Sequence, residues 1–112
     1  MPTEMRQIAF QQQEVARALL DYDKRRDNKF PAGTIRTIAI GEEPDIHATI
    51  VFDEIKGGST EVKVGPEVLA ASLILFCINN KIPMPVESTK RLQKTGDGVA
   101  LFVVKRDKAL AR

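Results

Sequence analysis

Several residue types that commonly build functional sites are scarce in this sequence. The 112 residues include one cysteine, one histidine, one tyrosine and no tryptophan. A single cysteine cannot form an internal disulfide, and Cys77 lies in an apolar run, where a thiol behaves as a small hydrophobic residue. Aromatic residues are 5% of the chain, so few can stack on nucleic-acid bases. We therefore expect neither a disulfide framework nor a base-stacking surface.

Long apolar runs are also absent. The most apolar segment is Val68 to Ile78, with ten apolar residues in eleven, whereas a membrane-spanning helix needs about 20. The polar N-terminal residues Met-Pro-Thr-Glu-Met-Arg-Gln lead into no apolar region of a secretory signal. These features predict a single domain over residues 1–112 that has no membrane partner and is cytoplasmic.

The apolar segment 68–78 is predicted to be a helix buried at the centre of the domain. Gly65-Pro66-Glu67 supplies a proline for the first turn and an acid near the positive end of the helix. Asn79-Asn80-Lys81 offers residues typical of a helix end, and Pro83 then prevents continuation. A helix that is apolar on all sides must be covered by other elements.

Residues 3–26 are predicted to form a long amphipathic N-terminal helix, because they contain no glycine or proline after Thr3, a candidate N-cap. A stripe with seven-residue spacing runs along it, and we name this stripe the helix seam. It lies either on the sheet of its own chain or against a partner helix, which can belong to a second copy. Phe10 and Leu20 lie off the stripe. The helix seam consists of Met5, Ile8, Gln12, Val15, Leu19 and Tyr22.

Three segments with β-branched residues and alternating polarity predict a three-strand meander at 34–40, 46–53 and 59–64. The segment 86–94 is ambiguous between a strand and a short helix, and we favour a strand because Thr95-Gly96-Asp97-Gly98 is a strong turn signal. Residues 99–104 are apolar on both faces, which predicts a strand that is central in the sheet or covered on both sides, with Phe102 at a core position. The last residues, 106–112, read as a basic tail.

Together these elements predict an α+β fold. The meander and the C-terminal hairpin form one antiparallel sheet over 34–105, packed on the buried central helix, and the N-terminal helix packs beside them.

Candidate sites for catalysis or metal binding are weak. His47 shares a predicted strand face with Asp45, Thr49 and Asp53, but one histidine and one well-placed carboxylate fall short of the three or four ligands of a metal site. Lys56-Gly57-Gly58-Ser59-Thr60 has the residue types of a phosphate loop, yet it joins two strands rather than a strand and a helix. No nucleophile lies in a known motif. We expect no catalytic residues, no metal and no cofactor.

The charges are unevenly distributed, although the net charge is only +2. Residues 40–67 carry seven acids and two bases, and residues 90–112 carry seven bases and two acids. Either the two ends are ordinary solvated surfaces or they attract a charged partner. The candidate residues for non-specific binding to phosphates are Lys90, Arg91, Lys94, Lys105, Arg106 and Lys108.

These observations favour a small, non-enzymatic interaction module that binds a protein partner or a second copy of itself through the helix seam or a sheet edge. The alternative is a non-specific nucleic-acid-binding protein that uses the C-terminal basic residues. A helix-turn-helix over 68–93 is a weaker form of this alternative, because Pro83 and Pro85 fill the connection.

Overall fold

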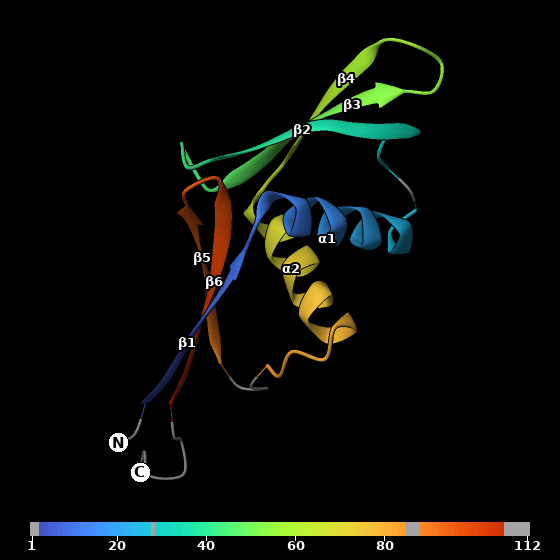
Figure 1. The fold of residues 1–112 in the computed structure, drawn as a ribbon. Coiled ribbons are helices and arrows are strands. Elements are labelled where there is room, and N and C mark those ends of the chain that lie inside the picture. The colour runs from blue at the N-terminus through green and yellow to red at the C-terminus, as the bar shows by residue number, and fades with distance from the viewer. Residues whose placement is uncertain (1–2, 28, 85–87, 107–112) are drawn as a thin grey trace.

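The computed structural model of the chain describes residues 3–27, 29–84 and 88–106. The order of the strands and helices is one that the sequence predicts only in part (Figure 1). The elements are β1 (Thr3–Phe10), α1 (Gln12–Arg25), β2 (Gly33–Gly41), β3 (His47–Glu54), β4 (Ser59–Val64), α2 (Pro66–Asn79), β5 (Thr89–Thr95) and β6 (Gly98–Arg106).

The strands form two antiparallel sheets of three strands each, which confirms the α+β class. Sheet A has the order β1-β6-β5 and sheet B the order β2-β3-β4. The prediction that the C-terminal hairpin completes the sheet of the meander is wrong, since β6 pairs with β1 and β5 and with no strand of sheet B. The apolar strand β6 is central, as predicted, but its second neighbour comes from the N-terminus of the chain.

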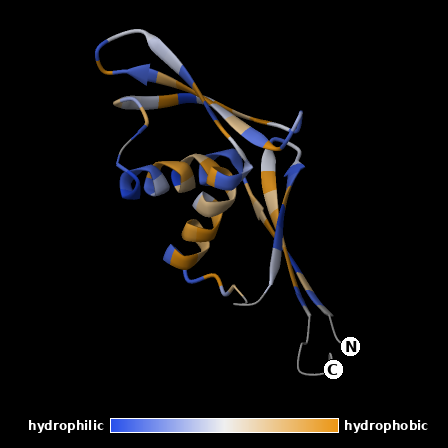
Figure 2. Ribbon diagram, turned by 180° about the vertical axis from the view of Figure 1, so that it is seen from behind, coloured by the Kyte–Doolittle hydropathy of each residue, from blue (hydrophilic) through white to orange (hydrophobic). Residues whose placement is uncertain are grey.

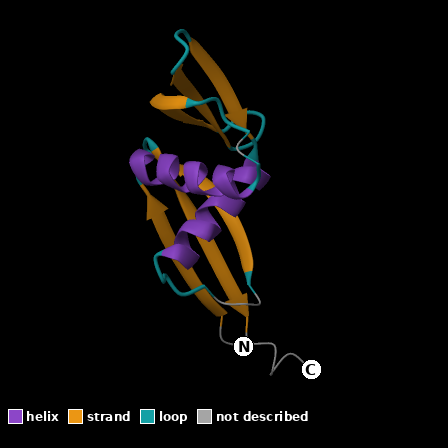
Figure 3. Cartoon of the chain, turned by 90° about the vertical axis from the view of Figure 1, so that its right-hand side faces the viewer, coloured by secondary structure: helices purple, strands orange, loops and turns teal. Residues whose placement is uncertain are grey.

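Both helices lie between the two sheets (Figures 1 and 3). Helix α2 lies along one face of sheet A, and α1 runs beneath sheet B and packs on α2. One continuous core joins them. Sheet B contributes Ile50 and Phe52, sheet A contributes Leu101 and Val103, and all four side chains are at most 1% exposed.

The predicted N-terminal helix over 3–26 is wrong for its first third. Residues Thr3–Phe10 are strand β1, and the helix begins only at Gln12. The N–H of Gln11 donates to the carboxylate of Glu14 at 2.8 Å, which satisfies a backbone donor that the first turn leaves without a helical partner. This bond marks the helix start and separates the strand from the helix.

The meander lies close to its predicted position. Strands β2, β3 and β4 begin and end within one residue of the predicted segments 34–40, 46–53 and 59–64. Burial alternates along β3, where Ala48, Ile50 and Phe52 face the core. The alternation that the sequence shows is therefore the pattern of a sheet covered on one face only.

The central apolar segment forms α2, as predicted. Leu69, Leu73 and Cys77 are fully buried on the side of α2 that faces the core. Its burial is less complete than expected, because Ile78 near the end is 63% exposed, and the helix is apolar on all sides (Figure 2). Within the described residues no helix is both long and apolar enough to cross a membrane.

The ambiguous segment 86–94 contributes a strand to the C-terminal hairpin. Strand β5 spans Thr89–Thr95 and a tight turn leads into β6, although residues 86 and 87 of the predicted strand lie outside the described residues. Gly98 lies so close to β1 that a Cβ there would come within 2.1 Å of the carbonyl oxygen of Phe10. A residue without a side chain is therefore required where β6 begins.

Candidate interaction surfaces

Sheet A has one covered face and one uncovered face. The helix-side face carries Val99, Leu101 and Val103, which are buried beneath the helices. The opposite face, here called the outer face, is covered by no described element, and Figures 1 and 2 show both helices on the other side. An uncovered sheet face has to be polar, or it becomes a surface for association.

The outer face of sheet A carries an apolar strip on β1 and β6. Met5 is 69% exposed and lies directly opposite Val104 in the β1–β6 register. Phe102, two residues from Val104 on the same face, is partly exposed, and neither side chain belongs to the packed core. We name Met5, Phe102 and Val104 the apolar strip. The expectation that Phe102 is a core residue is wrong, because its face of the sheet has no cover.

The predicted helix seam does not exist as one surface. Met5 and Ile8 lie on strand β1, on opposite faces of sheet A, while the other four residues lie on α1. Val15 and Leu19 are 0% exposed and pack in the core of their own chain. Of the two alternatives for this stripe, the structure therefore supports packing within the chain for its central part. Only Met5 remains a strongly exposed apolar residue among the six.

The two edges of sheet A differ in charge. Strand β5, at one edge, carries Lys90, Arg91 and Lys94 and no acid. Strand β1, at the other edge, carries one acid, Glu4, and one base, Arg6. Basic side chains along an edge oppose pairing with another strand, so β5 is a protected edge and β1 is not.

The basic residues proposed for phosphate binding do not share one face. Lys90, Lys94 and Lys105 lie on the helix-side face, and Arg91 lies on the outer face. The ammonium of Lys90 also donates to the hydroxyl of Ser88 at 3.1 Å. Of the remaining two candidates, Arg106 is the last residue of β6, and Lys108 lies outside the described residues.

His47 lies at the start of β3 and is held by the backbone. Its Nδ1 is 2.8 Å from the carbonyl oxygen of Asp45, and its ring lies over Gly41 of the neighbouring strand, where a Cβ would come within 2.5 Å of Nε2. Asp53, at the far end of β3, pairs with Arg36 instead. In the parts of the chain that the structure describes, no group of three or more His, Cys, Asp or Glu side chains could hold a metal.

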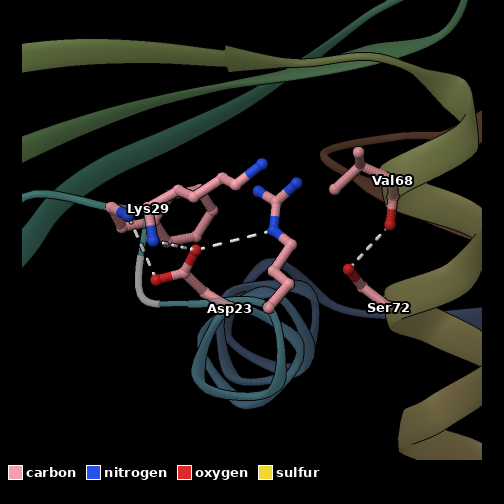
Figure 4. A network of polar contacts seen from close by, with 6 residues as sticks. Asp23, Lys29, Val68 and Ser72 are labelled. Atoms are coloured by element: carbon pink, nitrogen blue, oxygen red, sulfur yellow. Dashed lines mark hydrogen bonds and ion pairs between the residues drawn. The ribbon is translucent and has the colours of Figure 1, made fainter.

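A buried carboxylate fixes the connection between α1 and β2 (Figure 4). Asp23 is 5% exposed, and its two oxygens accept the backbone N–H groups of Lys29 and Phe30 at 3.0 and 3.1 Å. The guanidinium of Arg26 lies 3.5 Å from the same carboxylate and over the rings of Tyr22 and Phe30. Two hydrogen bonds and an opposite charge satisfy this carboxylate, so the cluster stabilises the connection between α1 and β2.

Helix α2 carries a buried hydroxyl and a buried thiol. Ser72 is 0% exposed, and its hydroxyl donates to the carbonyl of Val68 at 2.7 Å (Figure 4). Cys77 is also 0% exposed, and burial raises the pKa of its thiol. A buried thiol that is harder to ionise is a poor nucleophile. The hydroxyl of Ser72 thus has a hydrogen-bond partner, and the thiol of Cys77 is unreactive within the core.

A groove between α1 and β2 is a weaker candidate surface. Its apolar lining includes Leu20, which is 36% exposed, together with Ile35 and Ile38. The free edge of β2 beside it is interrupted by an irregular register at Arg36, which does not pair with β3. Bulges of this kind discourage a further strand from pairing.

Comparison of the chain with protein-family models, with curated proteins and with solved structures finds no match.

Proposed function

We propose that this chain is a small, non-enzymatic interaction module of the cytoplasm that associates with a second copy of itself. The apolar strip on the outer face of sheet A carries the proposal. It places the exposed side chain of Met5 next to Val104 and Phe102, beside a strand edge with little charge. Exposed apolar surface next to an open edge is a common arrangement at interfaces between subunits.

Self-association through this strip can be tested with one substitution and a matched control. Met5→Lys places a charge in the strip, which opposes burial against another subunit. Ile55→Lys is the control, since Ile55 is 82% exposed and lies beyond β3 in sheet B. Light scattering after gel filtration, over a range of micromolar concentrations, measures the mass of each variant.

The wild-type chain and Ile55→Lys should behave as dimers that dissociate on dilution, and Met5→Lys should be a monomer at the same concentrations. A wild-type chain that stays monomeric throughout contradicts the proposal. Dimers that survive Met5→Lys unchanged would show that the strip is not the interface.

The same samples can exclude the nucleic-acid alternative or support it. Titration with a short duplex and with a single strand at about 50 mM and 200 mM salt gives binding that weakens steeply with salt if phosphate contacts drive it. The division of Lys90 and Arg91 between two faces leads us to expect weak binding even at the lower salt concentration.

A further inference from the structure

The free edge of β1 is available for another strand. One edge of β1 pairs with β6 along all eight residues from Thr3 to Phe10, and no described strand pairs with the other. The N–H and C=O groups of that free edge have no partner in a neighbouring strand, and they form a template for pairing. Met5 belongs to this edge strand, so the free edge adjoins the apolar strip.

We infer that β1 of a second copy pairs antiparallel with this edge and that Met5 lies opposite Met5 of the partner subunit. The inference depends on the proposed self-association and specifies its geometry. The two sheets A then form one continuous six-stranded sheet with the order β5-β6-β1-β1-β6-β5, related by a twofold axis at Met5. The same surface of each copy is used, as in most dimers.

The charges of β1 select this register. Residues directly opposite each other in an antiparallel pair lie on the same face of the sheet, so one residue of β1 must lie opposite its own copy, and the twofold axis passes between the two. An axis at Met5 places Glu4 opposite Arg6 of the partner subunit, and the pair occurs twice. Opposite charges facing each other across strands stabilise the pairing.

The neighbouring registers lack this complementarity. An axis at Glu4 places two glutamates opposite each other, and an axis at Arg6 places two arginines opposite each other; like charges in such pairs are destabilising. An axis at Gln7 places Glu4 opposite the buried Phe10 of the partner subunit. Only an axis at Met5 pairs every charge of β1 with an opposite charge.

The position of Arg6 suits this role. Its Nη1 donates to the carbonyl oxygen of Pro83 at 2.6 Å, which holds the guanidinium on the helix-side face, where Glu4 also lies. Because a guanidinium has five N–H donors, donors remain for a carboxylate from the partner subunit. The intrachain bond thus orients the group before association.

The outer face supports the same register independently of charge. Met5 pairs with Val104 within the chain, and an axis at Met5 brings the two methionines side by side. The two apolar strips then join into one that runs from Val104 across both methionines to Val104 of the partner subunit. Met5, which is 69% exposed in the single chain, gains an apolar neighbour, and this gain favours association.

Charge reversal is the first test. Glu4→Arg and Arg6→Glu each create two like-charged pairs across the axis, and each should weaken the dimer about tenfold at low salt. The double variant restores opposite charges in exchanged positions and should recover the wild-type dissociation constant to within about threefold. Single variants without effect, or a double variant weaker than both single variants, would overturn the register.

Cysteine cross-linking is the second test. Directly opposite residues in antiparallel strands have Cα atoms about 4.5–5.5 Å apart, which a disulfide can bridge, so Met5→Cys should give a covalent dimer under mild oxidation. Gln7→Cys lies on the same face, but its partner copy would be about 14 Å away along the strand, so it should not cross-link. The buried Cys77 makes the wild-type chain a control without covalent dimer.

The tests separate the register from the proposed function. A dimer in which Gln7→Cys cross-links and Met5→Cys does not would overturn the register and leave self-association standing. A chain that is monomeric at all concentrations would overturn both.

Discussion

The carboxylate of Asp23 near the end of α1 accepts the backbone N–H of Phe30 at 3.1 Å. Phe30 in turn lies against the ring of Phe52 in β3, with centroids 5.3 Å apart. The bond therefore ties α1 to the connection that leads into sheet B, and it helps to hold the first helix and the second sheet in one body.

Asp23→Ala should lower the free energy of unfolding by about 2–4 kcal/mol, because two backbone N–H groups and the guanidinium of Arg26 lose a buried acceptor. Urea denaturation measures the change. Asp21→Ala is the matched control: Asp21 makes only an exposed pair with Arg17, so its loss should cost less than about 1 kcal/mol. Equal effects of the two substitutions would contradict the stabilising role of Asp23 in the connection between α1 and β2.

Adjacent buried positions of α2 should respond very differently to alanine. Leu73 fills the core at 0% exposure, and Leu73→Ala should lower the unfolding free energy by about 2–5 kcal/mol. Ser72 is equally buried, but its hydroxyl only adds a second hydrogen bond to the carbonyl of Val68. Ser72→Ala should therefore change the unfolding free energy by less than about 1 kcal/mol. A large loss for Ser72→Ala would mean that the hydroxyl has another role.

The thiol of Cys77 should make stability depend on pH in the alkaline range. Burial raises its pKa above the ordinary value of 9.0, so the folded chain keeps the proton at a pH where the unfolded chain loses it. The stability from this group is fully present below about pH 9 and is lost as the pH rises further. The difference in unfolding free energy between the wild type and Cys77→Ala should therefore shrink above pH 9, and a constant difference would refute the argument.

The comparison with Cys77→Ala also removes the other groups that titrate in this range. All other side chains are the same in both proteins, so their contributions cancel in the difference. Denaturant unfolding at a series of pH values provides the measurement.

The elements that the sequence predicts correctly are those with local signals. Strand β3 alternates between polar and apolar residues, and α2 has Gly65-Pro66 at its start and Asn79-Asn80 at its end. These signals involve neighbouring residues only, so they do not depend on how the rest of the chain folds.

Strand β1 could not be predicted from its own residues. Thr-Glu-Met-Arg-Gln-Ile-Ala-Phe is rich in residues that favour helices, and tertiary pairing with β6 overrides this preference. The predicted fold gave the second neighbour of the apolar strand 99–104 to the meander, whereas β1 supplies it. One signal was present, because Phe10 lies off the predicted helix seam, and it is buried on β1.

The apolar strip was missed for a related reason. The apolar residues on both faces of β6 predict a strand that is central or covered on both sides, whereas β6 is central and both helices lie on one face of sheet A (Figure 1). Side-chain patterns show which residues of a strand are apolar, but the placement of the helices decides which face they cover. That placement depends on contacts between α1 and α2, which local patterns do not contain.

The basic residues of β5 should limit how far association proceeds. In a dimer that pairs through β1, both outer edges of the six-stranded sheet are β5, and each carries Lys90, Arg91 and Lys94. Replacing all three with threonine gives an uncharged edge of a residue type that favours strands. Two different self-pairing edges can alternate without closing, so this variant should form species larger than dimers that grow with concentration.

Light scattering across a dilution series measures this growth, and a control must separate the edge from the loss of charge. Replacing Lys24, Arg25 and Lys29 with threonine removes the same charge from exposed positions outside both sheets, so that variant should remain a dimer. Larger species in both variants would trace the effect to net charge. Dimers in both would mean that β5 is closed to pairing for another reason, and its bases would then be free for a different role, such as contact with phosphates.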